Sequence, residues 1–232
     1  MDQSLAEKSY RYIRERLSSG ELSPGNQLVN RTLAEAIGVS VIPVREAINR
    51  LASEGLVEHV PGAGAFVRQP SRQDLDDLYV LRDALESCAA AEAARHITER
   101  QLQELDQILD RFKETTKLIE KQPKRHSNKR QQSRWLDDEK AFHELLVEAS
   151  RNETLARVIR DNLAIVNVFE AQRCDPSLLT YEVASETCIS KGKLIESLRD
   201  RDPDRARKVM SDQIQRGRQV VVGFFSRSSK GS

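Results

Sequence analysis

Residues 28–67 read LVNRTLAEAIGVSVIPVREAINRLASEGLVEHVPGAGAFV, and this stretch decides the fold of the N-terminal part of the chain. Apolar side chains at 33–37 recur at helical spacing and predict a short helix that ends at Gly38. Ser40 then stands at the cap position of a second helix. That helix tolerates Pro43, because the N–H groups of a first helical turn have no partner within the helix.

The flanking segments complete this pattern. Apolar residues between positions 5 and 17 recur at helical spacing and predict a first helix. Two β-prone runs at 56–60 and 65–68 are joined by the turn-forming sequence PGAG, which predicts a β-hairpin. We therefore expect a winged helix-turn-helix domain over residues 1–69, made of three helices followed by a hairpin wing.

Such a domain presents the N-terminal end of one helix to the major groove of DNA. Arg45 lies one turn into that helix and has the planar fork that recognises guanine. Ser40 and Arg31 are placed to contact phosphates, and Gly62 in the wing lets the main chain approach the DNA backbone closely. The alternative is a winged helix used only for protein contacts.

The rest of the chain is typical of an all-α antiparallel bundle. Pro70 marks the boundary, so we expect a linker at 70–72, a helical domain at 73–227 and a tail at 228–232. Start signals include a capping box of Thr98 with Gln101, a cap at Asn152, and Asp202 before a proline. The predicted helices lie near 72–95, 99–120, 133–150, 153–173, 177–200 and 203–226.

Composition excludes several classes of protein. No stretch is apolar enough to span a membrane and no signal peptide is visible, so we expect a cytoplasmic protein without a membrane partner. The net charge is +1, and residues 1–69 hold equal numbers of basic and acidic groups. The prediction of DNA binding therefore depends on the motif and on local placement, not on the overall charge.

One segment interrupts the helical pattern. Residues 121–134, KQPKRHSNKRQQSR, contain six basic groups and no acidic ones. We interpret the segment as a solvated, partly disordered connection between helices. The alternative is an accessory contact with phosphate.

Residues 28–67 also resemble the winged helix of the GntR family. The resemblance is carried by GVS at 38–40, PVREA at 43–47, GLV at 55–57 and GAFV at 64–67. The helical remainder resembles the FCD-type effector domain of the FadR-like subfamily. This resemblance implies a homodimeric transcriptional regulator, which we expect to be a repressor, binding double-stranded operator DNA under control of a small-molecule effector.

Two departures from the family pattern fall in the DNA-reading helix. Val41 stands where the family usually has a basic residue, and Ile42 stands where it usually has threonine. Val41 cannot bind phosphate or guanine, but it can touch the methyl group of thymine. We therefore expect a different operator preference, a lower affinity, or both.

The resemblance also implies a metal site in many FCD domains, formed by a carboxylate, a histidine four residues later, and two further histidines. Glu139 and His143 match the first pair. Lys191 and Gln213 align with the other two positions, and a lysine ammonium repels a metal cation. We therefore expect no metal cofactor. If zinc or nickel were bound, Glu139 and His143 would hold it.

The same positions suggest a pocket for an anionic effector. Arg82 aligns with a position that faces the effector in similar proteins, and Arg82, His143, Lys191 and Gln213 together suit a carboxylate metabolite. Glu139 then pairs with Lys191, and the alternative is that this pair is only structural. A metal-dependent regulator of the same fold or an all-α metal-dependent enzyme are further alternatives. We expect no enzyme, because no catalytic motif is visible.

Overall fold

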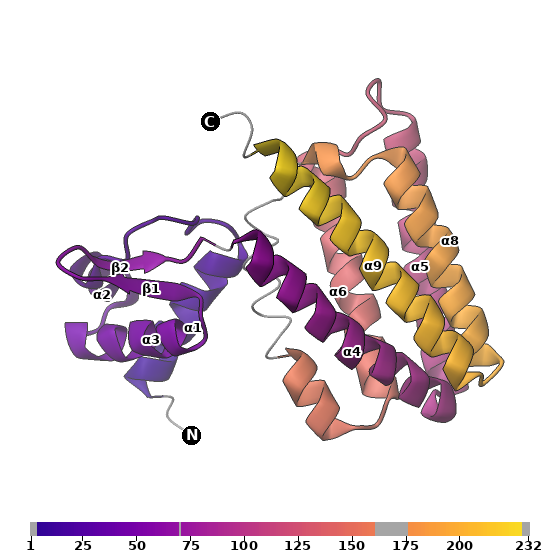
Figure 1. Cartoon of the computed structure of the whole chain (residues 1–232), viewed down its shortest axis with the longest axis horizontal. Helices are drawn as coiled ribbons and strands as arrows, with labels where there is room; N and C mark the ends of the chain where they lie inside the picture. Colours follow the sequence, from indigo (N-terminus) through magenta and orange to yellow (C-terminus); the bar gives the residue numbers. More distant parts are fainter. Residues whose placement is uncertain (1–3, 70, 161–175, 229–232) are drawn as a thin grey trace. The chain divides into compact units, whose positions relative to one another are not determined.

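The computed structural model describes residues 4–69, 71–160 and 176–228. These residues form two units, and the chain passes from the first to the second between Ser71 and Arg72 (Figure 1). The first unit has three helices and a two-stranded sheet, and the second is helical throughout. The predicted fold class, a winged helix-turn-helix followed by a helical domain, is confirmed.

The N-terminal unit has the predicted order of elements. The two strands are antiparallel, with Val57 opposite Val67 and Val60 opposite Gly64. The core is formed by Ile13 and Leu17 of the first helix and by Val44 and Leu51 of the third, all with no exposed surface. The elements are α1 (Leu5–Ser18), α2 (Asn30–Ile37), α3 (Val41–Ser53), β1 (Val57–Val60) and β2 (Gly64–Val67).

The turn between α2 and α3 is set by one glycine and one lysine. Gly38 ends α2 in the left-handed region at φ 75°, which a side chain would strain. Lys8 of α1 donates from Nζ to the carbonyl oxygen of Ile37 at 3.0 Å, so a cation meets the negative end of α2. Together they fix where α3 begins.

The second unit is an antiparallel bundle (Figure 1). Arg218 of the last helix pairs with Asp76 near the start of α4, and Arg201 donates to the carbonyl of Ile97 just beyond the end of α4, so α4 and α9 run antiparallel. Residues 153–160 are also helical. The elements are α4 (Arg72–His96), α5 (Glu99–Glu120), α6 (Lys129–Ala149), a 3-10 turn (Pro176–Leu178), α8 (Tyr181–Arg199) and α9 (Pro203–Ser228).

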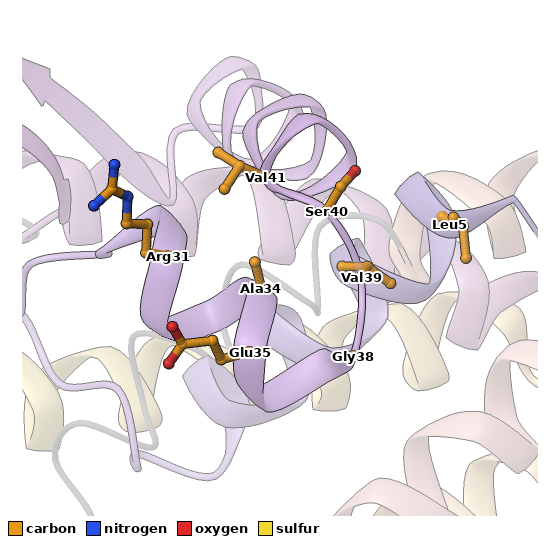
Figure 2. A pocket seen from close by; sticks show the side chains of 8 residues that line it. All are labelled: Leu5, Arg31, Ala34, Glu35, Gly38, Val39, Ser40 and Val41. Atoms are coloured by element: carbon orange, nitrogen blue, oxygen red, sulfur yellow. The ribbon is translucent and has the colours of Figure 1, made fainter.

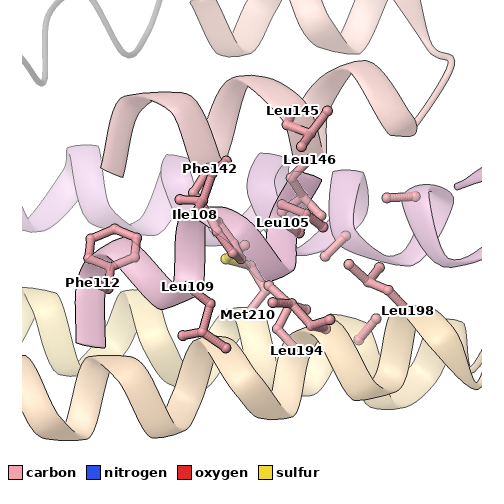
Figure 3. Close-up of a cluster of buried hydrophobic side chains, with 14 of the residues drawn as sticks. Leu105, Ile108, Leu109, Phe112, Phe142, Leu145, Leu146, Leu194, Leu198 and Met210 are labelled. Carbon is pink, nitrogen blue, oxygen red and sulfur yellow. The ribbon is translucent and has the colours of Figure 1, made fainter. Parts of the chain in front are cut away.

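The bundle core lies between α4, α5, α6, α8 and α9, and Figure 3 shows the part of it formed by the last four of these helices. Phe112 is fully buried and meets Trp135 edge to face, with 4.5 Å between ring centroids. Leu194, Leu198 and Met210 close the other side of the core without exposed surface. The core is aliphatic with few rings, as the low aromatic content of 5% requires.

The predicted helix starts are confirmed where a cap could be recognised. Thr98 and Gln101 form a capping box, Asn152 accepts from the N–H of Leu155, and Asp202 accepts from the N–H of Arg205. The part of the predicted 153–173 helix beyond residue 160 lies outside the described residues.

The basic segment 121–134 is more ordered than expected. Helix α6 begins at Lys129 rather than near 133, because Asn128 and Gln131 form a second capping box. The connection is therefore limited to 121–128. Ser127 anchors this connection, because it is buried, its N–H donates to the carbonyl oxygen of Leu179 and its Oγ donates to the carbonyl oxygen of Pro176. Most side chains of the segment are exposed, as the prediction of a solvated segment requires, but residues 129–134 are helical, so the interpretation of the whole segment as a partly disordered connection is wrong.

Among the described residues, no helix is both long enough and apolar enough to cross a membrane.

Candidate nucleic-acid interface and buried ionic network

One face of α3 is exposed along its length. Ile42, Arg45, Glu46 and Asn49 all project from it, at the spacing that places side chains on one side of a helix. Ile42 is 71% exposed. Among the residues that the structure describes, Arg45 and Glu46 have no ion pair. The opposite face of α3 is buried in the core by Val44, Ala47, Ile48 and Leu51.

The N-terminus of α3 is not capped by a side chain. Ser40 has the extended backbone of a cap residue, but its hydroxyl makes no cap hydrogen bond, so the predicted capping bond is absent. The first turn of α3 contains no acidic residue. Both facts leave the partly positive helix end and the Ser40 hydroxyl open to an anion such as phosphate.

An open groove of about 620 Å³ lies at this end of α3 (Figure 2). Arg31 and Glu35 of α2 line it, and so do Ser40 and Val41 at the start of α3. Leu5 of α1 also lines the groove and is 55% exposed. The full lining is Leu5, Arg31, Ala34, Glu35, Gly38, Val39, Ser40 and Val41.

The turn of the wing exposes main chain at Gly62, which has no side chain. Gly62 has φ 75° and nothing lies within 4 Å of the place where its side chain would begin. A flat phosphate backbone could therefore come close to this turn.

A polar cluster that the sequence did not reveal ties α1 to α3. The Tyr10 hydroxyl donates to Glu54 at 2.9 Å and accepts from Arg14 at 2.8 Å. The Arg50 guanidinium lies 3.7 Å from the centroid of the Tyr10 ring and donates to Glu7 at 2.8 Å. Burial and the bond to Glu54 raise the pKa of Tyr10 to about 12, so the phenol stays neutral and keeps the proton that it donates to Glu54.

In the helical unit, three helices contribute to a continuous ionic network. Lys191 of α8 donates from Nζ to Oε2 of Glu139 at 2.9 Å. His143, one turn after Glu139 on α6, has Nε2 3.5 Å from that same oxygen and Nδ1 3.0 Å from Oε2 of Glu86. Arg82 of α4 completes the network, with Nε 2.9 Å from Oε1 of Glu86.

The network lies in the protein interior at its Lys191 end. Lys191 is only 1% exposed, and its Nζ lies 4.0 Å from the ring centroid of Phe142 and 5.0 Å from that of Phe112. Aromatic faces attract a desolvated cation, so the two rings and Glu139 together hold the ammonium in its charged form. Glu86, at 2% exposure, is buried equally well.

Mutual attraction sets the charges of the network. Burial alone would raise the pKa of Glu139, but Lys191 and His143 outweigh it and lower that pKa to about 2. Burial likewise opposes the charge of Glu86, yet Arg82 and His143 bring its pKa well below the usual range. Burial lowers the pKa of His143, and Glu86 and Glu139 overcome this effect and raise it above 6.5.

The structure therefore brings together four of the five residues predicted for an effector pocket. Gln213 is the exception, since no hydrogen bond in the described residues joins it to the network and its Nε2 is buried without a partner. Glu86 belongs to the network but was missed. Its signal in the sequence was its position four residues after Arg82, on the same face of one helix.

The donor atoms of the network do not suit a metal ion. The ammonium of Lys191 lies against the Glu139 carboxylate, where a metal bound by Glu139 and His143 would have to lie. Within residues 4–160 and 176–228, no group of three or more histidine, cysteine, aspartate or glutamate side chains is placed to hold a metal.

Comparison with known proteins matches both units to known families. The family described as bacterial regulatory proteins, gntR family, matches residues 5–67, and the FCD domain matches residues 77–216. Two solved structures share the fold. McbR/YncC of E. coli has a TM-score of 0.74 and 21% sequence identity, and the match covers 97% of this chain and all of that chain. A putative GntR regulator of Rhodococcus has a TM-score of 0.70 and 18% sequence identity, and the match covers 94% of this chain and 98% of that chain.

Curated relatives are regulators rather than enzymes, in agreement with the expectation from the sequence. McbR of Escherichia coli strain K12 is 34% identical over 102 residues, 44% of this chain and 46% of the relative. The regulator YdhC of Bacillus subtilis is 28% identical over 157 residues, which are 65% of this chain and 62% of the relative. The repressor RspR of Escherichia coli strain K12 is 33% identical over 107 residues, which are 46% of this chain and 47% of the relative. The chain thus spans about half of the curated relatives it matches, and three-fifths of YdhC.

Proposed function

The chain belongs to the GntR family of bacterial regulatory proteins and carries an FCD domain, and on this premise we propose that it is an effector-controlled transcriptional repressor that binds operator DNA. The observation that carries the proposal is the exposed face of α3 beside its uncapped N-terminus. A rigid helix with free side chains and a free positive end is what major-groove recognition requires.

Each DNA-binding residue has a separate task in this proposal. Arg45 reads a guanine through its two-pronged guanidinium. Ser40 and Arg31 hold phosphates on the two sides of the groove, and Gly62 rests against the DNA backbone. Two copies of the chain form a homodimer, so that two heads read the two halves of a pseudo-palindromic operator. The repressor RspR among the relatives supports repression rather than activation.

The effector in this proposal is a small carboxylate metabolite bound at the ionic network. Arg82, Lys191 and His143 gather three basic side chains around Glu86 and Glu139, and both carboxylates raise the pKa of His143 and so favour its charged form. A carboxylate effector binds this basic cluster and competes with Glu139 for the Lys191 ammonium. The positive charge that a metal provides in other FCD domains is supplied here by Lys191, and the domain works without a metal.

Binding of the effector regulates DNA binding only if the effector prefers one of two arrangements of the protein. The network joins α4, α6 and α8, so an anion that separates Glu139 from Lys191 changes the packing of these helices. Because α4 begins directly after the winged helix, this change reaches the DNA-binding unit through the chain itself.

The test has two steps on the full-length protein. Duplexes are first selected from a random pool, and the affinity for the selected duplex is measured by fluorescence anisotropy. A panel of mono-, di- and tricarboxylates is then screened for stabilisation against heat, each beside its uncharged amide.

We expect a selected duplex with inverted half-sites, and a carboxylate that raises the melting temperature and changes the DNA affinity while its amide does neither. Equal binding of all duplexes would contradict operator recognition. A stabilising amide would contradict the anionic effector while leaving DNA binding intact.

A further inference from the structure

Ile42 is the most exposed large hydrophobic side chain among the described residues, at 71%. It lies in the first turn of the helix whose outer face is proposed to enter the major groove. Solvated apolar side chains are common on protein surfaces, but this one shares its face with Arg45 and Asn49, which suit base edges. An apolar group at this point needs an apolar partner in the groove.

The major groove offers one such partner. Of the four bases only thymine carries a methyl group there, and the other exposed groups are hydrogen-bond donors and acceptors. Isoleucine has no polar atom in its side chain, so it gains nothing from guanine, adenine or cytosine. It also covers their polar edges without satisfying them, which penalises those bases.

The spacing along the helix limits where the thymine lies. Arg45 lies three positions after Ile42, a rise of about 4.5 Å along the helix axis. Successive base pairs are about 3.4 Å apart. The base below Ile42 therefore lies one or two steps from the guanine below Arg45.

Val41 is a less suitable reader of the same methyl group. Its side chain is only partly exposed, and it lines the groove between α2 and α3 rather than the outer face of the helix (Figure 2). Ile42 projects further and carries one more methylene group.

We propose that Ile42 is a specificity-determining residue that reads the 5-methyl group of a thymine within two base pairs of the guanine read by Arg45. This inference rests on the proposed DNA binding and deepens it, because it names one base of the operator and the atom by which it is recognised.

The experiment removes that atom from the DNA. In the selected duplex, each thymine is replaced in turn by deoxyuridine, which pairs identically and lacks only the methyl group. We expect one position in each half-site where the replacement weakens binding by about fourfold, the effect of one buried methyl group. The variant Ile42→Ala should bind the thymine and deoxyuridine duplexes equally at that position.

The matched control is Val41→Ala, which should keep the preference for thymine. Loss of the preference in Val41→Ala, with its retention in Ile42→Ala, would overturn the assignment to Ile42. Equal binding of every deoxyuridine duplex by the unaltered protein would overturn methyl recognition while leaving DNA binding established. Failure to select any duplex would overturn the proposed function itself and this inference with it.

Discussion

The Nζ atom of Lys191 lies 2.9 Å from Oε2 of Glu139, and the lysine side chain is almost completely buried between two phenylalanine rings. A buried cation with a single carboxylate partner depends on that partner, because either charge left alone must be desolvated without compensation. This relationship leads to the first prediction.

Glu139→Gln should destabilise the helical unit by roughly 3 kcal/mol, since it leaves the Lys191 ammonium unpaired. Adding Lys191→Met should recover most of that loss, because a methionine fits beside the rings without a charge. Trp135, the single tryptophan of the chain, is buried in the helical core, so its fluorescence during urea unfolding reports this unit. The exposed Lys193→Met serves as the control, with a change within about 0.5 kcal/mol. A double variant as unstable as the sum of the singles would contradict the pairing.

The stability of the helical unit should fall as the pH rises above neutrality. The pKa of His143 is raised above 6.5 in the folded protein, so its contribution is complete below pH 6.5 and is lost as the pH rises through the folded pKa. His143→Gln should remove this decline in the urea midpoint between pH 6 and 9. His96→Gln, at an exposed site on α4, should retain it.

Acid should also weaken the network, because it protonates Glu139. The pKa of Glu139 is lowered to about 2, so its stabilising contribution is present above about pH 4.5 and disappears as the pH falls toward 2. The urea midpoint of the unaltered protein should drop across this range, and that of Glu139→Gln should drop less. Identical acid profiles for the two proteins would show that Glu139 is not held in its charged form by Lys191 and His143.

Val41→Arg should restore a phosphate contact at the start of α3. The slope of log affinity against log salt concentration should then steepen by about 0.9, the effect of one additional phosphate neutralised. Anisotropy titrations of the selected duplex at several salt concentrations measure it. Arg11, exposed on α1, provides the comparison, since Arg11→Ala changes the charge elsewhere. An unchanged slope for Val41→Arg would place residue 41 outside the interface.

The untagged protein, purified without chelators, should contain much less than one transition metal ion per chain. Lys191→His should remove the ammonium and add a third ligand beside Glu139 and His143, so that this variant takes up about one zinc ion, because three protein ligands and a water complete a zinc site. Elemental analysis measures both, with Lys193→His as the control. A full equivalent of metal in the unaltered protein would show that Lys191 does not replace the metal.

The elements of the fold were predictable where local chemistry alone determines them. Gly38, Thr98 and Asp202 act through bonds to residues a few positions away, and each helix end follows from them. The start of α6 was equally local, since Asn128 and Gln131 have the spacing of a capping box. It was missed because the surrounding basic residues suggested a solvated loop, although a charged sequence does not prevent a well-capped helix.

The candidate site was only partly predictable. Glu139 and Lys191 could be paired through the family resemblance, but the place of Glu86 depends on how α4 packs against α6. The cluster around Tyr10 links residues 44 positions apart, and no periodicity within one helix indicates such a contact. Contacts that depend on the register between helices are therefore the part that local patterns leave undetermined.

The pairing of Lys191 with Glu139 also restricts how this domain can diverge. A lineage that loses the lysine alone leaves the half-buried Glu139 carboxylate with His143 and without its closest cation, and one that loses the carboxylate alone strands an ammonium between aromatic rings. Descendants therefore inherit the two positions as a unit or exchange both in quick succession. The ancestry of this domain should show positions 139 and 191 changing together, while the surface around them drifts freely.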